Sequence, residues 1–284
     1  MTPTVGTFAD LTDQSMPLVA FAEAVVERGL ASLFLNEHTH LPLDAPTSRF
    51  PPGGPIPERY ARFWDPYIAL SFVAASTPLE IGTAVSLIGE HDPIQLSHAV
   101  ASLDRLSGGR LVLGVGWGWH REEFADHGRS PRVRARVVEE WVALMRALWR
   151  EEEVVSFSGE FVHLAPSRMW PKPAQRGGPP VLLGAPAGPR TFGRIAQWAD
   201  GWITMGAELA ASDVHALRRA WEEAGRSGEP SVTVIHNPLP GAPPFARTLD
   251  RAAELGAGRV LYHVFDGDRD RMLRRLDRAT TATI

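Results

Sequence analysis

Two histidines, His38 and His40, follow the short apolar run at residues 32–36 and are separated by a single residue. Because alternate residues of an extended segment point the same way, such a pair can supply half of a metal site. The later runs that end at Gly184 and Met205 offer no further ligand, so we predict no metal and expect His40 to bond locally. Imidazole can also give or take a proton near neutral pH, and this is the role we favour for His38.

A second segment with chemical potential is the glycine-rich stretch at residues 184–191, which reads GAPAGPRT. Helical periodicity follows it, and the N-terminus of a helix offers unpaired N–H groups and a partial positive charge to a phosphate. Arg190 and Thr191 could add a charged and a hydroxyl contact. A tight turn with a solvated arginine explains the same residues equally well. The candidate cofactor-binding residues here are Gly184, Ala185, Gly188, Arg190 and Thr191.

A third segment places glycines beside tryptophans. Gly114, Gly116 and Gly118 alternate along it, and Trp117 and Trp119 stand between and after them. Glycine lets a flat ring approach the backbone closely, and the indoles could form the walls of an apolar pocket. Alternatively, the tryptophans belong to the core. The glycines resemble part of a dinucleotide-binding fingerprint, but the third glycine is wrongly spaced and the preceding run is the fourth rather than the first.

Eight short apolar runs alternate with segments of helical periodicity, and these elements would position the residues above. Strict alternation predicts a parallel sheet, and eight units in 284 residues predict a (β/α)8 TIM barrel rather than an open doubly wound sheet. In a barrel, the active site lies at the C-terminal ends of the strands, where these segments fall. The runs are residues 4–8, 32–36, 80–86, 110–116, 180–184, 201–205, 231–236 and 259–264.

Two segments interrupt the alternation. Residues 41–63, rich in proline and glycine, follow the second strand and are expected to cover the barrel mouth like a lid. Residues 154–164 predict a small hairpin before the fifth strand, with Ser158 and Gly159 in its turn. Helices are predicted at residues 16–28, from Asp65 to about residue 75, from Asp92 to the turn at residues 107–109, and at residues 133–148, with aspartate caps before first-turn prolines in the second and third.

Composition narrows the class of protein. The chain has 29 basic and 33 acidic residues, a net charge of −4, and therefore no basic excess that favours nucleic acid. It has no cysteine, which excludes disulfides and thiol nucleophiles. The N-terminus has no cationic start, and apolar stretches are shorter than the ~20 residues that span a bilayer. We expect one barrel domain over residues 1–284, located in the cytoplasm, with neither nucleic acid nor membrane as a partner.

Several longer stretches make the chain recognisable. Residues 79–124, 36–42, 169–186 and 199–202 resemble the bacterial luciferase-like monooxygenase superfamily, and in particular the subgroup presumed to use coenzyme F420. The resemblance covers nearly the whole chain, and the stretch at residues 79–124 is its most specific part. It implies a (β/α)8 barrel with a reduced flavin or deazaflavin in its mouth and the phosphate tail near strands five and six.

The resemblance also implies roles for individual residues. A non-proline cis peptide in the third strand supports the ring from behind and falls on Ala84 and Val85. His38 lies beside the ring and gives a proton or holds an anion, and Glu123 matches the acidic residue after strand four. Gly116 and Trp117 complete the predicted cofactor site. Members commonly form dimers through the helices beside strands two and three. The apolar face of Ala69, Phe72 and Val73 is compatible with such a contact, although it could equally pack on the sheet.

Three departures refine the choice of cofactor and substrate. Trp117 stands where luciferase has an arginine that binds the FMN phosphate, which argues against FMN. Pro42 and Trp119 replace a tryptophan and a glutamate of the deazaflavin-dependent glucose-6-phosphate dehydrogenases, which argues against a sugar phosphate. A serine common in the turn after strand five is absent.

We therefore predict an oxidoreductase that uses coenzyme F420 to transfer a hydride to or from a small organic substrate. His38 and Glu123 are the candidate catalytic residues. An FMN-dependent monooxygenase that uses reduced flavin and oxygen is the first alternative. A non-catalytic flavin-binding barrel is the second.

Overall fold

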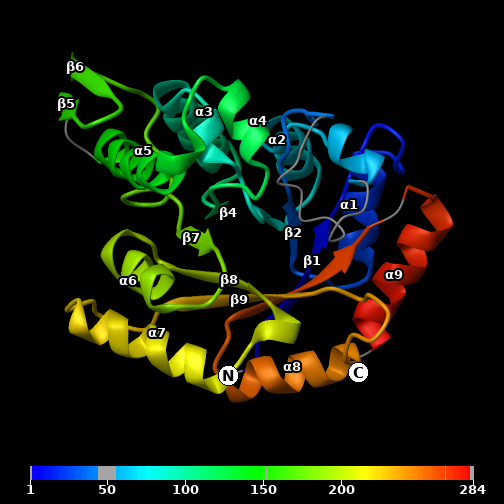
Figure 1. The fold of residues 1–284 in the computed structure, drawn as a ribbon. Helices are drawn as coiled ribbons and strands as arrows, with labels where there is room; N and C mark the ends of the chain where they lie inside the picture. The colour runs from blue at the N-terminus through cyan, green and yellow to red at the C-terminus, as the bar shows by residue number, and fades with distance from the viewer. Residues whose placement is uncertain (1, 44–55, 151–152, 266, 282–284) are drawn as a thin grey trace.

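A closed barrel of eight parallel strands forms the centre of the molecule (Figure 1). The computed structural model describes residues 2–43, 56–150, 153–265 and 267–281. Around the barrel the strands follow the order β1-β10-β9-β8-β7-β4-β3-β2, so neighbours in sequence are mostly neighbours in space. The barrel strands are β1 (Thr4–Ala9), β2 (Ser32–Leu35), β3 (Glu80–Thr83), β4 (Leu111–Val115), β7 (Val181–Gly184), β8 (Gly201–Met205), β9 (Ser231–His236) and β10 (Arg259–Val264). The predicted (β/α)8 barrel is confirmed.

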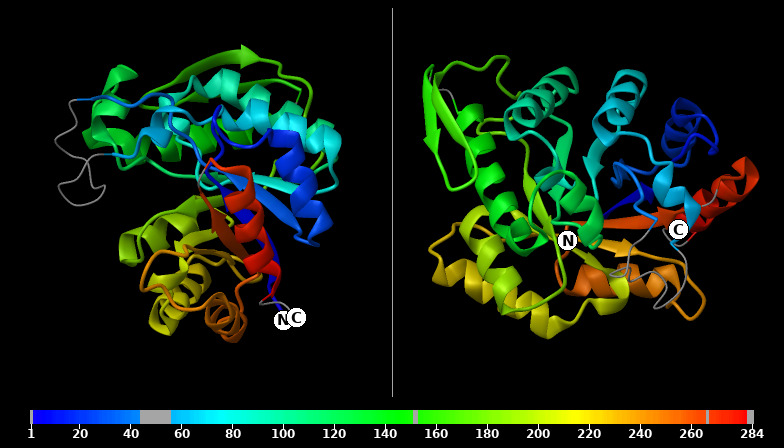
Figure 2. Two further views of the ribbon diagram at one scale, coloured as in Figure 1. Left: turned by 90° about the vertical axis from the view of Figure 1, so that its right-hand side faces the viewer. Right: turned by 45° about the horizontal axis from the view of Figure 1, so that its top comes forward.

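Helices form an outer ring around the strands in all three views (Figures 1 and 2). Two begin at the predicted caps: Asp65 accepts a hydrogen bond from the backbone N–H of Ile68, and Asp92 accepts from those of Ile94 and Gln95. In the described part of the chain, none of the helices combines the length and the apolarity needed to cross a bilayer. The helices of the ring are α1 (Leu18–Glu27), α2 (Pro66–Ser76), α3 (Pro93–Leu106), α5 (Arg134–Trp149), α6 (Pro189–Trp198), α7 (Ala211–Glu223), α8 (Phe245–Glu254) and α9 (Arg269–Thr281).

Shorter elements extend the loops at the barrel mouth. They are η1 (Glu58–Ala61), η2 (Ile88–Glu90), α4 (Arg121–Asp126), η3 (Pro131–Val133) and η4 (Gly206–Glu208). The sequence prediction missed α4 because six residues cover less than two turns and show no apolar period.

The core has two compartments because strand side chains alternate between the barrel interior and the helix layer. The interior is filled by one cluster of large apolar side chains, and Gly82 leaves the space that the ring of Phe34 occupies. The outer cluster packs the strands against the helices and includes Trp141, Trp149 and Trp202, all fully buried. The interior cluster is Phe8, Phe34, Ala84, Val112, Leu182, Ile203, Ile235 and Leu261.

The predicted hairpin is confirmed and lies at the edge of the molecule beside α5 (Figures 1 and 2). Strands β5 (Val155–Ser158) and β6 (His163–Ser167) pair antiparallel, and the N–H of Gly159 donates to the carbonyl of Val162 at 2.9 Å. The second strand continues past the predicted end at Leu164. That residue packs against Leu144 and Leu148 of α5, so the hairpin is anchored by its apolar face.

The predicted lid at residues 41–63 is described only in part, because residues 44–55 lie outside the described residues. Its C-terminal end forms η1 and lies at the barrel mouth, where the Tyr60 ring centroid is 5.2 Å from that of His38.

Strand β3 ends at Thr83, earlier than predicted, and the peptide bond between Ala84 and Val85 is cis, as the resemblance implied. Pairing resumes at Ser86, which forms an isolated bridge with Val115.

Candidate functional site

A pocket of about 1040 Å³ opens among the C-terminal ends of the strands. This is at the upper end of the range for small-molecule sites, so a cofactor ring and a substrate fit in it together. It is lined by His38, Ala84, Val85, Gly116, Trp117, Gly184, Gly188, Arg190 and Thr191, all singled out from the sequence. Further lining residues include Phe8, Asn36, Tyr60, Trp119, Arg121, Arg134 and Arg194.

Two predicted site residues, Ala185 and Glu123, do not line the pocket. The carbonyl of Ala185 accepts a hydrogen bond from the Trp202 indole N–H at 2.8 Å, so its backbone helps to fix the start of the cradle. Glu123 is fully buried and contacts His38, which does line the pocket.

The glycines at the ends of β4 and β7 have a structural role that the sequence interpretation did not include. A Cβ atom on Gly116 or on Gly184 would overlap the side chain of Val85. The two glycines therefore make room first for Val85, which lines the floor of the pocket, and through it for any ring that rests there.

The most informative arrangement in the pocket is the His38–Glu123 pair. His38 Nδ1 lies 2.6 Å from Glu123 Oε2, and the two side chains are 5% and 0% exposed. Glu123 Oε1 accepts a hydrogen bond from the backbone N–H of Thr39 at 2.8 Å, and Nδ1 of His120 caps the helix by accepting from the N–H of Glu123 at 3.1 Å. Because Nδ1 is engaged, Nε2 is the ring nitrogen available for chemistry.

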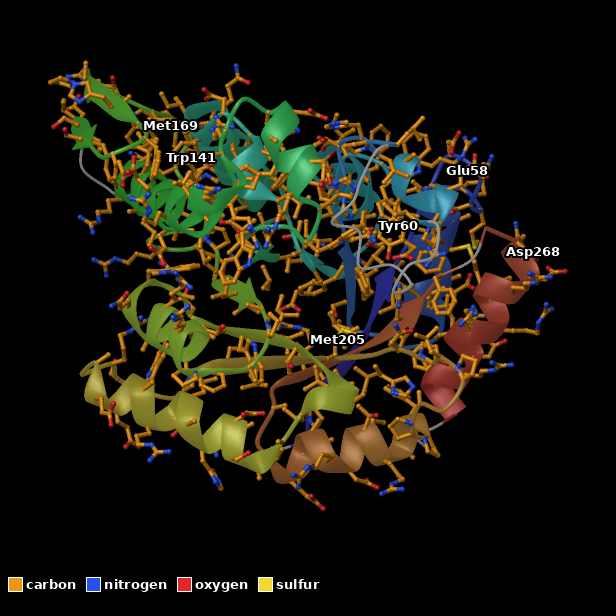
Figure 3. All side chains as sticks on the ribbon, in the orientation of Figure 1. Glu58, Tyr60, Trp141, Met169, Met205 and Asp268 are labelled. Atoms are coloured by element: carbon orange, nitrogen blue, oxygen red, sulfur yellow. The ribbon has the colours of Figure 1, made fainter. Side chains whose placement is uncertain are left out.

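Aromatic rings surround the His38 imidazole. The centroids of Tyr60, Phe63 and Trp119 lie 5.2, 6.1 and 5.4 Å from its own. Tyr60, labelled in Figure 3, comes from η1. Burial and the negative charge of Asp10 raise the pKa of Tyr60 to about 12, so the phenol stays protonated at neutral pH. This wall limits the access of water to the histidine.

Asp10, which the sequence interpretation missed, connects η1 to the barrel. It is 3% exposed and accepts hydrogen bonds from Arg59 Nε at 2.9 Å and Asn36 Nδ2 at 2.8 Å, with His263 Nε2 at 3.0 Å. Burial would raise the pKa of this carboxyl, but the charges and hydrogen bonds of His263 and Arg59 outweigh burial and lower it. The Asp10–Arg59 contact fixes the helix that carries Tyr60.

Glu37, also missed, braces the loop after β3. Its carboxylate accepts from Ser86 Oγ and from the N–H of Leu87, each at 2.6 Å, and its other oxygen lies 2.6 Å from His91 Nε2. Burial would raise the pKa of Glu37, but the His91, Ser86 and Leu87 hydrogen bonds lower it, and the Glu37 charge in turn raises the pKa of His91. The pair ties the loop after β2 to the loop after β3.

The buried carboxyl of Glu90 differs from those of Asp10 and Glu37 in its protonation. Glu90 is 6% exposed, both its oxygens are buried without a hydrogen-bond partner in the described structure, and His127 Nε2 lies 3.7 Å away. Burial, followed by the charges of Glu123 and Glu37, raises the pKa of Glu90 to about 9. Glu90 is therefore a neutral acid at pH 7.

The predicted anion cradle has the geometry of an open helix N-terminus. Gly188 has φ +155°, which favours glycine, and a Cβ there would meet nothing within 4 Å. The helix α6 begins at the next residue, with Thr191 buried in its first turn. Within the described ranges no side chain pairs with Arg190, whereas Arg194 Nε lies 2.5 Å from Glu139 and its guanidinium 5.4 Å from the Trp117 ring. Arg190 is thus the more available cation.

The two histidines of the first motif have different partners. His38 bonds to Glu123, whereas His40 bonds to its neighbour Thr39 at 2.9 Å and to Asp126 of α4 at 3.0 Å. In the part of the chain that the structure describes, no group of three or more His, Asp or Glu side chains is arranged to hold a metal ion.

The fold and the pocket define a (β/α)8 barrel whose mouth can hold a flat cofactor beside a buried histidine–glutamate pair. A profile of the luciferase-like monooxygenase family matches residues 6–263, and the chain belongs to this family. The family comprises oxidoreductases and monooxygenases, which confirms the resemblance seen in the sequence.

The chain is similar to several individual proteins. An uncharacterized protein of Mycobacterium tuberculosis is 38% identical over 266 residues, covering 91% of each chain. An F420-dependent glucose-6-phosphate dehydrogenase of Kineococcus radiotolerans is 29% identical over 221 residues, covering 74% of this chain and 59% of that protein. The crystal structure of the monooxygenase RslO1 from Streptomyces bottropensis has a TM-score of 0.76 at 18% identity, covers 98% of both chains and shares the fold.

Proposed function

We propose that the protein is an oxidoreductase that binds coenzyme F420 and transfers a hydride between it and a small organic substrate. The observation that carries the proposal is the buried His38–Glu123 pair, joined at 2.6 Å and directed at the pocket. A proton donor or acceptor beside the cofactor is what hydride transfer to a carbonyl, or from an alcohol, requires. The F420-dependent relatives support the same choice.

The residues present fit such a cofactor. Gly188 leaves the N-terminus of α6 open, and Arg190 and Thr191 are placed in its first turn to hold an anionic tail. Val85 and Trp117 are placed to hold the flat ring system. When bound, the deazaflavin supplies the hydride-transfer chemistry.

The protein supplies orientation and the proton. Glu123 fixes the ring orientation of His38 and favours a proton on Nδ1, which leaves Nε2 to exchange a proton with the substrate oxygen. The Tyr60, Phe63 and Trp119 rings give the imidazole an apolar surrounding. The Asp10–Arg59 and Glu37–His91 pairs hold the loops that carry these groups.

The first prediction concerns cofactor choice. Titration of the pure protein should show F420 binding at least tenfold more tightly than FMN, a difference of about 1.4 kcal/mol. Arg190→Ala should weaken F420 binding, because the helix N-terminus loses the cation that pairs with the tail. Arg219→Ala, at an exposed position on α7, is the control and should bind F420 as the wild type does.

FMN binding tenfold tighter than F420 would instead favour the monooxygenase alternative. That enzyme would consume oxygen, whereas turnover with F420 should proceed under anaerobic conditions. Binding of either cofactor without substrate-dependent oxidation of its reduced form would favour the non-catalytic barrel.

A second prediction concerns assembly, and we propose a homodimer formed through α2. Of the three residues considered from the sequence, Ala69 and Val73 are buried in the protein. The third, Phe72, is 59% exposed and forms an apolar face with Ile68, which is 64% exposed. Large exposed apolar side chains on one helix face are typical of an interface.

Light scattering at micromolar concentration should therefore give twice the chain mass of 31.1 kDa. Phe72→Asp should give the monomer, because a charge would be buried without a partner. Leu239→Asp, at an apolar residue exposed in the loop after β9, should remain dimeric. A monomeric wild type would contradict the proposal.

A further inference from the structure

The pocket is cationic at one end and largely uncharged at the other. Its lining residues follow β1, β2, β3, β4 and β7, and β1 stands opposite β7 because equal numbers of strands separate the two in both directions around the barrel. Apart from His38, the only charged side chain that the segments after β1, β2 and β3 contribute, among the described residues, is Glu37, which is paired with His91. The lining arginines all follow β4 or β7, and they are Arg121, Arg134, Arg190 and Arg194.

Asn36 contributes an amide at the uncharged end, and a buried carboxylate fixes its orientation. Asn36 Nδ2 donates to Asp10 Oδ1 at 2.8 Å, while Asp10 also bonds to Arg59 and His263. Burial would raise the pKa of Asp10, but the charges and hydrogen bonds of His263 and Arg59 lower it, so the carboxyl is ionised at neutral pH. An ionised carboxylate can only accept hydrogen bonds. The amide of Asn36 therefore turns its NH2 group to Asp10 and its oxygen away.

The oxygen of this amide is available to a ligand. In the described part of the chain, Asn36 Oδ1 has no hydrogen-bond partner, and yet it does not belong to the buried atoms that lack one, so it is accessible. Because Asn36 lines the pocket, Oδ1 is an acceptor presented to a molecule bound there. His38 lines the pocket two residues further along the chain. The acceptor and the candidate for proton transfer therefore serve the same end of the pocket.

The reacting oxygen of a substrate cannot satisfy this acceptor. In the oxidation of an alcohol, the carbon gives its hydride to the oxidised deazaflavin and the hydroxyl gives its single proton to His38 Nε2. The carbonyl oxygen that results has no proton to donate. A second O–H or N–H group on the substrate is therefore needed, because a substrate without one leaves Asn36 Oδ1 unpaired when it displaces solvent.

We propose that Asn36 determines specificity by selecting an uncharged carbonyl or alcohol substrate that carries a second hydrogen-bond donor near the reacting carbon. The amide oxygen accepts a hydrogen bond from that donor, and Asp10 positions the amide. The rings of Phe8 and Tyr60 line the same end and provide contacts for an apolar body. The proposal rests on the proposed function, because it names the substrate class of that site.

Three aryl ketones test the substrate class in turnover with reduced F420. Phenacyl alcohol carries a hydroxyl group beside the ketone, propiophenone has a methyl group in the place of that hydroxyl, and benzoylformate has a carboxylate on the carbonyl carbon. The wild-type kcat/KM should be at least about tenfold higher for phenacyl alcohol than for either of the others. Equal values for phenacyl alcohol and propiophenone, a preference for benzoylformate, or turnover of none of these ketones would overturn the proposal.

Two variants test the residue. Asn36→Leu removes the acceptor at similar size, and Asn36→Ser keeps a hydroxyl donor but has no amide oxygen. Each should bring the ratio of kcat/KM for phenacyl alcohol over propiophenone close to one, with F420 affinity near that of the wild type. A general disturbance from the lost Asp10 contact would lower both rates and leave the ratio unchanged, because the ketones differ only at the hydroxyl position. An unchanged ratio would overturn the proposal, and so would weaker F420 binding in both variants, since Oδ1 would then serve the cofactor.

A measurement without cofactor separates this proposal from the proposed function. The chain has only two asparagines, Asn36 and Asn237, so labelling with 15N-asparagine gives side-chain amide signals that the Asn36 variants assign. In cofactor-free protein, phenacyl alcohol should shift the Asn36 signals at lower concentration than propiophenone does. Equal shifts with both ketones, or none with either, would count against the acceptor role. A protein that shows this difference and yet binds no F420 would refute the proposed function alone.

Discussion

Replacing His38 by alanine is expected to lower kcat by roughly 10²–10⁴-fold, with F420 binding close to that of the wild type. The expectation follows from geometry: Glu123 holds Nδ1 at 2.6 Å, and Nε2 is left for the substrate in a pocket walled by aromatic rings. Stopped-flow measurement of hydride transfer and a separate cofactor titration give the two quantities.

The division between the two quantities decides the role of His38. Loss of kcat at saturating cofactor with unchanged affinity indicates proton transfer. Weaker binding with kcat retained at saturation would mean that His38 only holds the ring. His215→Ala removes an exposed histidine of α7 and should change neither quantity. If His38→Ala is equally silent, the role carried over from the family is wrong.

Glu123→Gln tests the role of the carboxylate that contacts His38. The amide keeps the shape of the side chain but replaces one carboxylate oxygen of the 2.6 Å contact that orients the His38 ring, so kcat should fall while the cofactor still binds. Glu123 does not line the pocket, so its effect on the reaction is expected to act through His38, its contact among the lining residues.

The barrel could be predicted from the sequence because its information is local. Strand and helix periods alternate, and Asp65 and Asp92 precede prolines at helix starts. Each strand–helix unit can therefore be predicted from its own residues. The rim position of His38 follows from the same reasoning. The short α4 was missed because a six-residue helix carries no period, and yet it is the element that places Glu123.

The hydrogen-bond partners of the acidic residues in the site could not be predicted, and the reason is physical. Asp10 meets His263 across the barrel closure, and Glu37 meets His91 from the next loop. These contacts join segments that are distant in the chain, and a short acidic side chain looks the same in a sequence whether it is paired or solvated. The sequence also left open whether Val73 faces a partner or the sheet, because the almost uniformly apolar α2 does not show which side is covered.

Glu90 gives the largest expected effect on stability. In the unfolded chain its carboxyl has the ordinary pKa of 4.5, and in the folded protein burial and the charges of Glu123 and Glu37 raise the pKa to about 9. Between these values the folded state keeps a proton that the unfolded state releases. The free energy of unfolding is therefore expected to fall as pH rises through this window, by up to about 1.4 kcal/mol per pH unit from this group.

Glu90→Gln mimics the neutral acid and removes the titration. The free energy of unfolding should be measured with denaturant at pH 5 and at pH 8. Between these two pH values it should fall by on the order of 3 kcal/mol more in the wild type than in the variant. Glu23→Gln, which removes the same charge at an exposed position on α1, should follow the wild-type curve. Parallel curves for wild type and Glu90→Gln would mean that Glu90 ionises in the folded protein near its ordinary pKa, and that the buried carboxyls beside His38 do not hold it neutral.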